Sequence, residues 1–259
     1  MITEKNNKKL AIVIPSCDKY SDLWEILISQ IDSNFKDIEL TKYIICNSNH
    51  QNKIKGIEYI NVGADLGWSS NFKIALKQIN EQYVFLWIDD LILTSVVDAK
   101  LFKNILSSFT DEKGNCLRLN NVPKSNKNYN SFFGLVDKEA LYRTSTVMSI
   151  WNKEVLNDLL VPGENAWEFE TKGTIRSKKY DNFFVSYKPL FKFSNAVIKG
   201  KWNRRIKKKL IEQYRYNISD TRPSMSKIEQ IKYDLRLPAS SIYYRLYNLY
   251  LKINSIKLF

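Results

Sequence analysis

The sequence predicts an α/β protein in which a mostly parallel sheet is flanked by helices and followed by a basic α-helical C-terminal appendage. Two observations indicate this class. Short apolar segments alternate with helical patterns through residues 1–110, which is typical of parallel strands joined by helices. Positive charge concentrates at the other end, because residues 199–259 hold fifteen Lys and Arg against four Asp and Glu. We therefore expect one domain over residues 1–198 and a basic helical extension over residues 199–259.

Each element of the first half has its own signal. Three strands are expected in short segments rich in β-favouring residues, at Leu10–Ile14, Tyr43–Cys46 and Ile57–Val62. Helices are expected between them, from the spacing of apolar residues and from hydroxyl side chains suited to the N-cap. One helix begins near Ser21, with Leu23, Trp24, Leu27 and Ile31 on one face, and another near Ser69 or Ser70, with Phe72, Ala75, Leu76 and Ile79.

The segment Tyr83–Leu93 is the most informative in the chain. Its apolar residues run without polar alternation into Asp89 and Asp90, which predicts a strand buried on both faces that ends on two carboxylates. Adjacent carboxylates at the edge of a core repel each other, and a bound divalent cation removes that cost. Oxygen ligands suit Mg²⁺ or Mn²⁺, commonly together with substrate phosphates. The alternative is an ordinary acidic turn.

Polar clusters follow four of the expected strands. They are Pro15–Asp18, Asn47–Asn49, Gly63–Asp65 and Asp89–Asp90. Parallel sheets bind ligands at the carboxyl ends of their strands, so the four clusters are expected to converge on one crevice. Each cluster taken alone is also typical of a simple turn.

The second half is less regular. Residues 120–143 are polar, and we expect a mobile excursion or lid there. A strand at Thr144–Ser149 and a helix at Trp151–Leu160 are expected next. Pro162 and Gly163 end the helical pattern, and a new helix is expected to begin at Glu164. A late strand is expected at Phe183–Tyr187.

Glutamates gather around two large aromatic residues in the segment after Gly163. Glu164 and Glu168 are four residues apart, and on a helix they would share one face. One of them is a candidate general base, because partial desolvation by aromatic neighbours would raise its pKa towards neutrality. The alternative is that these acids simply complement the dipole of a helix N-terminus.

Composition excludes several classes of site. The single histidine, His50, argues against His-based zinc sites and Ser-His-Asp triads. Three cysteines without CxxC spacing indicate reduced thiols. Walker A and GxGxxG motifs are absent, so a phosphate would be held by a metal and by Lys or Arg. With no signal peptide and no apolar run near the ~18 residues of a membrane span, we expect a cytoplasmic protein.

These landmarks resemble those of GT-A glycosyltransferases, most of all small family-2-like bacterial enzymes of capsule and lipopolysaccharide biosynthesis clusters. The similar segments are Ala11–Pro15, Gly63–Asn71, Leu86–Asp90, Ser149–Lys153 and Glu164–Glu170. The resemblance spans roughly residues 9–202 and implies that residues 1–198 form a GT-A catalytic domain. The sequence departs from the family's pattern at two places. The metal motif here is Ile-Asp-Asp, and Asn47 stands where the family usually has an acid that binds the nucleotide base.

The resemblance implies a role for each matched residue. Asp90 corresponds to the direct ligand of a divalent Mn²⁺ or Mg²⁺, and Asp89 to an acid that contacts ribose or metal. Glu164 corresponds to the catalytic base, and Glu168 is kept as the alternative. The implied nucleotide-sugar site comprises Pro15, Ser16, Asp18, Asn47, Asp65, Trp68, Asn71 and Asp89.

We therefore interpret the chain as an inverting, metal-dependent glycosyltransferase. It would transfer a sugar from a nucleotide-diphosphate donor to a hydroxyl of a glycan or lipid-linked glycan in cell-surface polysaccharide biosynthesis. The alternative is a non-enzymatic nucleic-acid-binding protein, because Lys199–Lys209 contains seven cations with Trp202 and Tyr214 nearby. That alternative explains the basic extension but neither the Asp pair nor the glutamates, so no nucleic-acid partner is expected.

The extension also predicts contact with the anionic inner face of the cell membrane. A helix is expected from Ser224 to about Leu235, and Pro238 ends it. Ser241–Phe259 then predicts a basic amphipathic helix that suits an interfacial position, with Ile242, Leu246, Leu249, Ile253 and Ile256 in one stripe. Alternatively, the stripe packs on the catalytic domain or on a second copy of the chain in a homodimer.

Overall fold

The computed structural model describes residues 10–50, 54–122, 124–125 and 127–235. The chain divides into two compact units, Met1–Ser194 and Asn195–Phe259. The functional boundary expected between residues 198 and 199 stays a prediction.

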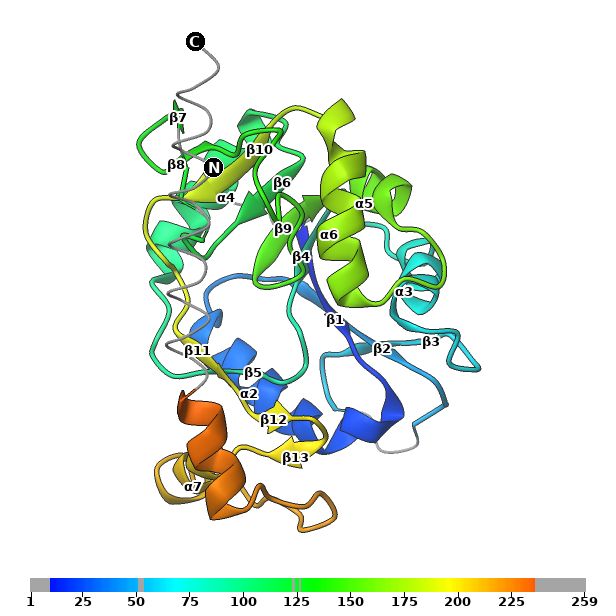
Figure 1. Ribbon diagram of the computed structural model, residues 1–259, viewed down its shortest axis with the longest axis vertical. Coiled ribbons are helices and arrows are strands. Elements are labelled where there is room, and N and C mark those ends of the chain that lie inside the picture. The colour runs from blue at the N-terminus through cyan, green and yellow to red at the C-terminus, as the bar shows by residue number, and fades with distance from the viewer. Residues whose placement is uncertain (1–9, 51–53, 123, 126, 236–259) are drawn as a thin grey trace. The chain divides into compact units, whose positions relative to one another are not determined.

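A mixed sheet forms the centre of the first unit (Figure 1). Among the described residues it has nine strands, in the order β3-β2-β1-β4-β9-β6-β10-β8-β7. Their bounds are β1 (Leu10–Pro15), β2 (Thr41–Cys46), β3 (Glu58–Asn61), β4 (Tyr83–Leu86), β6 (Cys116–Arg118), β7 (Lys127–Asn128), β8 (Phe133–Leu135), β9 (Ser149–Asn152) and β10 (Phe183–Ser186). β3, β2, β1 and β4 are all parallel, and β9 lies antiparallel between β4 and β6. The carboxyl ends of the four parallel strands therefore share one edge.

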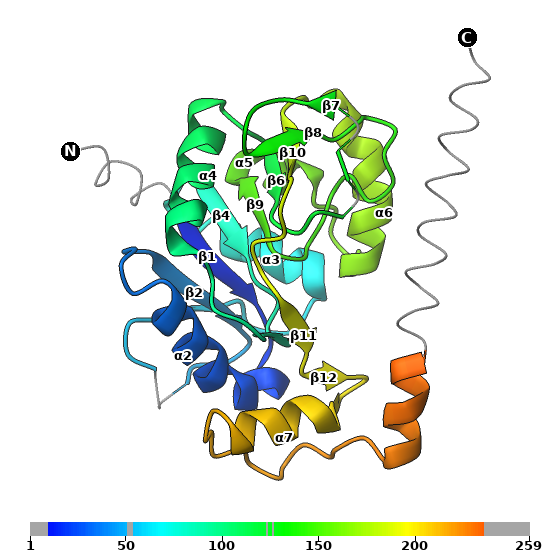
Figure 2. The same cartoon turned by 90° about the vertical axis from the view of Figure 1, so that its left-hand side faces the viewer.

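Helices cover both faces of this sheet (Figures 1 and 2). α2 (Trp24–Asn34) and α4 (Ala99–Asp111) pack on one face, and α3 (Trp68–Leu76), α5 (Lys153–Leu159) and α6 (Ala166–Arg176) on the other. β1 supplies both cores in alternation: Ile12 and Ile14 join the first, Ala11 and Val13 the second. A strand covered on both sides has no solvent face, which explains why β1 is apolar throughout. The predicted α/β class is confirmed.

In the middle of the unit, one strand and one helix begin later in the chain than predicted. The strand expected at Thr144–Ser149 is β9, at Ser149–Asn152, so Trp151 lies in a strand and not in the following helix. α5 begins only after Asn152, because the Asn152 side chain accepts hydrogen bonds from the backbone N–H groups of Glu154 and Val155. The predicted helix start at Trp151 is therefore wrong.

The polar stretch 120–143 also contributes to the sheet. It contains β7 and β8, and β8 pairs antiparallel with β10. Phe133 of β8 is fully buried, with its ring 4.7 Å from that of Phe184. Hydrophobic burial thus fixes part of the segment that was expected to be an excursion or lid.

Two further elements position the acidic turn after β4. β5 (Leu91–Leu93) follows that turn and pairs with β11 (Phe193–Asn195) in a separate two-stranded sheet. The chain then enters α4, whose Phe102, Ile105, Leu106 and Phe109 are all buried on one face. Neither element is among those predicted above, although this spacing is typical of an amphipathic helix.

The second unit is small and helical in its described part. A hairpin of β12 (Val197–Ile198) and β13 (Lys201–Trp202) leads into α7 (Arg204–Glu212), and residues 227–235 form a further helix. Trp202 and Leu210 are fully buried. The predicted amphipathic helix at Ser241–Phe259 lies outside the described residues. Within the described ranges, no helix is both long and apolar enough to cross a membrane.

Candidate active site

The candidate site begins at the shared edge of β3, β2, β1 and β4. Ser16 and Asp18 follow β1, Asn47 follows β2, Gly63 and Asp65 follow β3, and Asp89 and Asp90 follow β4. Adjacent loops are joined in pairs: Ser16 bonds to Asp89, the Asn47 backbone bonds to Asp18, and the Asn47 side chain donates to the Gly63 carbonyl at 3.1 Å. The edge is therefore a connected polar rim, as the sequence predicts.

Asp89 is buried, and protein groups fix its carboxylate. It is only 7% exposed, and its Oδ2 accepts a hydrogen bond from the Ser16 hydroxyl at 2.5 Å. Ser16 Oγ in turn accepts from the indole N–H of Trp24 at 2.8 Å. Asp90 is half-buried in the same turn, which Leu91 N closes by bonding to Ile88 O at 3.1 Å. The turn presents one fixed carboxylate and one more accessible carboxylate.

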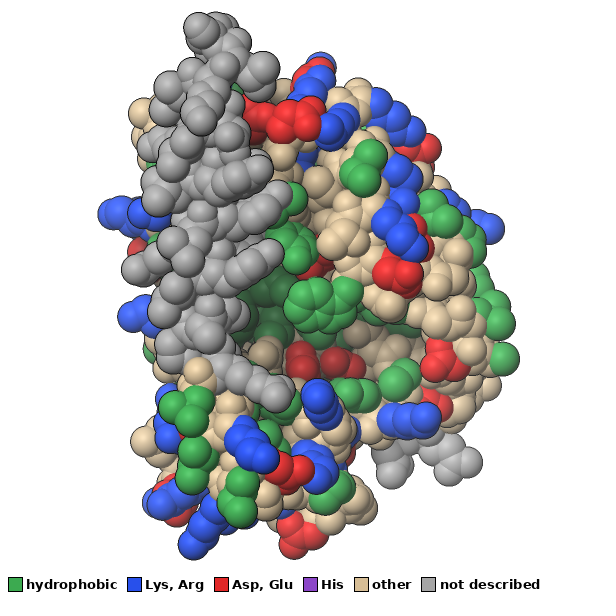
Figure 3. All heavy atoms as spheres, viewed as in Figure 1, with side chains coloured by type: hydrophobic (Ala, Val, Ile, Leu, Met, Phe, Trp, Pro, Cys, Tyr) green, Lys and Arg blue, Asp and Glu red, His purple; other side chains and the backbone are tan. Residues whose placement is uncertain are grey.

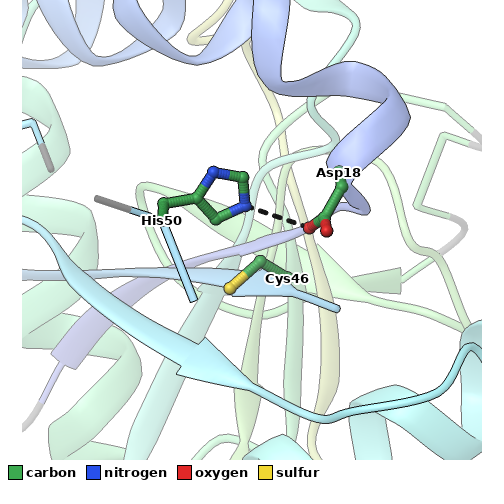
Figure 4. A group of neighbouring side chains, drawn as sticks. All are labelled: Asp18, Cys46 and His50. Atoms are coloured by element: carbon green, nitrogen blue, oxygen red, sulfur yellow. Dashed lines mark hydrogen bonds and ion pairs between the residues drawn. The ribbon is translucent and has the colours of Figure 1, made fainter. Parts of the chain in front are cut away.

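Asp18 organises the neighbouring part of the rim (Figure 4). It accepts hydrogen bonds from Asn47 N at 2.9 Å and Ser48 Oγ at 2.5 Å, and His50 Nε2 lies 3.0 Å from its Oδ1. Burial alone would raise the pKa of the Asp18 carboxyl. The bonds from Ser48, Asn47 and His50 outweigh that effect and hold its pKa at about 2. Asp18 therefore stays charged and orders the start of the β2–β3 loop.

Two groups of side chains contain possible ligands for the predicted divalent cation. Asp89 and Asp90 offer only carboxylate oxygens, the donor set that Mg²⁺ and Mn²⁺ prefer, and one turn holds them together, so they fit such an ion. Asp18, Cys46 and His50 form the one group of three in the described chain whose ligand atoms lie within 4.8 Å of one another (Figure 4). Their mixed donors suit zinc. Protein atoms already satisfy them, Cys46 Sγ lying 3.4 Å from Ser48 O, and we assign no metal there.

The loop after β3 leads directly into α3. Asp65 Oδ1 accepts from Gly67 N at 3.0 Å and from Asn71 Nδ2 at 2.8 Å, and Asn71 Oδ1 accepts from Leu66 N at 3.0 Å. Gly67 precedes the helix with φ of 89°, a conformation that glycine adopts without strain. Trp68 opens α3, its ring 5.6 Å from Phe169 on α6. Asn71 thus fixes the loop that carries Asp65.

Glu164 lies beside the start of α3. Its carbonyl accepts from Ser69 N at 3.2 Å, and Gly163 N donates to Ser70 Oγ at 3.1 Å. The Glu164 carboxylate is buried, and Arg176 binds both of its oxygens, at 2.9 and 2.6 Å. A bidentate guanidinium fixes the orientation of the carboxylate and uses two of its roughly four lone-pair positions. This pairing is not evident from the sequence.

Glu168 takes part in the N-terminal cap of α6. α6 begins at Ala166 with Asn165 as N-cap, so Glu164 precedes the helix and does not share a face with Glu168. Glu168 and Asn165 form a reciprocal capping box, and Lys172 pairs with Glu168 at 2.9 Å. The bond from Asn165, and then Lys172, lower the pKa of Glu168, which is opposite to the direction expected of a desolvated base. Its contacts are those of a cap.

Three arginines of the first unit, Arg118, Arg143 and Arg176, are held by protein groups. Arg143 is 2% exposed, donates to Ser177 O, Ser177 Oγ and Tyr180 O, and lies 3.7 Å from the centroid of the Phe183 ring. Arg118 is buried and donates to Tyr142 O. Arg176 binds Glu164 as described. Among the three, only Arg176 touches a predicted site residue.

Two side chains at the rim were not assigned to the site from the sequence. Trp24, predicted only as a core residue, orients Ser16, and the His50 ring packs edge-on to Trp24 with centroids 4.7 Å apart. His50 follows Asn47 by three residues, and a lone polar ring directly after a strand end was the available signal. Trp24 gave no such signal, because a tryptophan on the apolar face of a helix is typical of core packing.

Comparisons with known proteins place the fold. No protein-family model and no curated protein matches the chain. The structure of S. aureus TarS 1-349 in complex with UDP-GlcNAc is similar, with a TM-score of 0.50 and 17% identity over 71% of this chain and 57% of that chain. Glucosyl-3-phosphoglycerate synthase from Mycobacterium tuberculosis in complex with phosphoglyceric acid gives 0.46 and 11%, covering 85% and 88%. UDP-glucose pyrophosphorylase complexed with UDP-glucose gives 0.46 and 12%, covering 73% and 92%.

The likeness to TarS concerns the fold. It matches the α/β arrangement described above, a mostly parallel sheet flanked by helices, and so agrees with the predicted fold. The chain spans about 57% of the length of the TarS 1-349 structures that it matches.

Proposed function

We propose that this protein is a glycosyltransferase that uses a nucleotide-diphosphate sugar as donor. One observation carries the proposal: polar side chains after four adjacent parallel strands are hydrogen-bonded into one rim that ends on Asp89 and Asp90. In this rim Asp18, Asn47 and Asp65 would contact the nucleotide, and Asp89 and Asp90 would face the diphosphate. The similar TarS structure contains UDP-GlcNAc, which makes UDP-sugars the first donors to test.

Asp90, with Asp89, is proposed to hold a Mn²⁺ or Mg²⁺ ion. When bound, such an ion supplies positive charge that stabilises the departing diphosphate. The protein's part is to fix the carboxylates before substrate arrives. The bond from Ser16 to Asp89, supported by Trp24, does this for the buried member of the pair.

Glu164 is the favoured general base in a single inverting displacement. It would accept the proton of the acceptor hydroxyl while that oxygen bonds to the anomeric carbon and the diphosphate leaves with the electron pair of its own bond. Arg176 acts as a positioning residue, because its two hydrogen bonds hold the Glu164 carboxylate. Glu168 remains the second candidate, and its capping box and Lys172 pair favour it less.

The acceptor is proposed to be a hydroxyl of a glycan or lipid-linked glycan in capsule or lipopolysaccharide synthesis at the cytoplasmic face of the membrane. The basic second unit supports this assignment, because anionic carrier lipids and membrane surfaces attract cations. A donor-hydrolysis assay tests the function without requiring the acceptor. The protein would be incubated with Mn²⁺ and single nucleotide sugars, and release of the nucleotide diphosphate measured. We expect release from one donor class, lost in Asp90→Asn and kept in Asp37→Asn, an exposed acid in the loop between α2 and β2.

A further inference from the structure

The second unit contains a groove between α7 and the helix at residues 227–235. Its volume is about 610 Å³. Gln230 joins the two helices, because its Oε1 accepts from Arg204 N at 3.0 Å. The segments that precede them are joined as well, since Met225 N donates to Trp202 O at 3.0 Å. Asn203 caps α7 by accepting from Arg205 N and Ile206 N. The groove is therefore a built feature of this unit.

The charge of the groove is strongly positive. Five cations and one acid line it, together with two isoleucines: Arg204, Arg205, Lys207, Lys208, Lys227, Glu212, Ile211 and Ile231. Arg205 pairs with Asp234 at 2.8 Å, Lys207 with Asp220 at 2.8 Å and Lys208 with Glu212 at 3.8 Å. For Arg204 and Lys227, both exposed, no carboxylate partner is found among the described residues. The described part of the unit, 195–235, holds eleven Lys and Arg against four Asp and Glu, so the excess is general.

Apolar side chains stand exposed beside these cations. Ile231 is 57% exposed, and Ile228 and Leu235 on the same helix are 67% and 70% exposed. Their spacing of three and four residues places them in one stripe on that helix. Figure 3 shows hydrophobic and basic side chains side by side over this helix. A solvent-facing apolar stripe next to uncompensated cations indicates an amphiphilic, anionic partner.

We infer that this surface, the α7/227–235 groove with its isoleucine and leucine stripe, docks on a bilayer containing anionic phospholipid. Charge complementarity selects the partner: lipid phosphates would meet the cations, and the aliphatic stripe would enter the headgroup–acyl boundary. A nucleic acid is favoured less, since the groove lining holds isoleucines and no aromatic ring on which a base could stack. A second copy of the chain is also disfavoured, because two such surfaces repel each other. The inference goes beyond the proposed function and does not depend on it.

Vesicle flotation of the full chain tests the inference. Vesicles of phosphatidylcholine alone would be compared with vesicles that also contain phosphatidylglycerol. We expect flotation only with the anionic vesicles, and weaker flotation as salt is raised. Lys208→Gln/Lys227→Gln should weaken binding by about fivefold per charge removed. Ile228→Ser/Ile231→Ser should weaken it as well, because the stripe loses its apolar surface.

Matched variants separate this groove from charge in general. Lys36→Gln/Lys77→Gln removes the same charge from exposed positions of the first unit and should float like the unchanged protein. All substituted side chains are exposed, so melting temperatures should stay within about 2 °C. The inference is wrong if the full chain never floats, or if the groove variants float as well as the control. It is also wrong if the groove variants lose binding to random oligonucleotides while keeping vesicle binding.

Discussion

The Ser16 hydroxyl donates a hydrogen bond to Asp89 at 2.5 Å and so ties the loop after β1 to the turn after β4. Trp24 fixes the donor–acceptor direction of this hydrogen bond. Its indole N–H can only donate, and it donates to Ser16 Oγ at 2.8 Å. The single hydroxyl proton is thus left for Asp89. A core tryptophan thereby sets the position of a carboxylate at the candidate metal site.

The two aspartates should respond differently to substitution. Asp90→Asn should abolish donor turnover and leave the fold nearly unchanged, because Asp90 is half-buried and stands at the accessible side of the turn. Asp89→Asn should be damaging but less complete, since the amide oxygen can still accept from Ser16. Donor turnover with and without EDTA, alongside thermal unfolding, measures both effects. Full activity of Asp90→Asn, or of the unchanged protein in EDTA, would remove the metal assignment.

Glu164 and Glu168 can be separated by kinetics. Glu164→Gln should lower kcat about 10²–10⁴-fold with little change in donor affinity, because a base acts in the chemical step. It should also cost about 1–2 kcal/mol of stability, because Arg176, whose side chain is 28% exposed, loses its charged partner. Glu168→Gln should weaken the cap of α6 and keep kcat.

The decisive readout is therefore kcat corrected for the folded fraction. Arg176→Lys serves as a further control, because it keeps the charge and loses the bidentate geometry, and it should lower kcat less than Glu164→Gln does. If both Gln variants kept kcat, neither glutamate would be the base.

Acid should weaken the protein through Asp18. The Asp18 pKa falls from 3.8 to about 2 on folding, so the unfolded chain binds the proton first as pH falls. The stabilisation from this group is present above about pH 4 and is lost between pH 4 and pH 2. The carboxylate is about one-third exposed, so we discount the contribution to about 1 kcal/mol. Urea unfolding at several pH values should show a smaller acid effect in Asp18→Asn; an equal effect would refute this assignment.

Asn71→Ala should separate donor binding from chemistry. The variant loses the bonds to Asp65 Oδ1 and Leu66 N, which frees the loop that is proposed to contact the nucleotide. Donor affinity should fall about tenfold, equivalent to about 1.4 kcal/mol, while kcat at saturating donor stays within a factor of about two. A variant with unchanged affinity and reduced kcat would place Asp65 outside the donor site.

The sequence predicts the parallel half of the fold well, and physics explains why. β1, β2 and β4 are buried on both faces, so their apolar runs leave little ambiguity. β9 is harder, because Trp151 fits both a buried strand and the first turn of a helix, and the choice rests on the Asn152 cap. The segment around Phe133 is hard to predict for another reason. Its composition is polar and indicates a loop, but the one buried aromatic side chain of Phe133 anchors it in the sheet.

The candidate site divides in the same way. The positions of Asp89, Asp18 and Asn47 follow from strand ends, which sequence patterns locate. The pairing of Glu164 with Arg176 does not, because it joins residues at the two ends of α6 through the loop that precedes the helix. The Asn165 cap decides this geometry, and an N-cap shifted by one or two residues changes which glutamate faces the site.

Titration calorimetry with nucleoside diphosphates measures whether Asp90 holds a metal ion and a diphosphate together. The unchanged protein, Asp90→Asn and Asp37→Asn would each be titrated with UDP and other nucleoside diphosphates, with and without Mn²⁺. We expect one preferred nucleotide, which the unchanged protein and Asp37→Asn bind tightly only with Mn²⁺, and which Asp90→Asn binds at least about tenfold more weakly. Absence of binding to every nucleotide, or equal binding by Asp90→Asn, would contradict it.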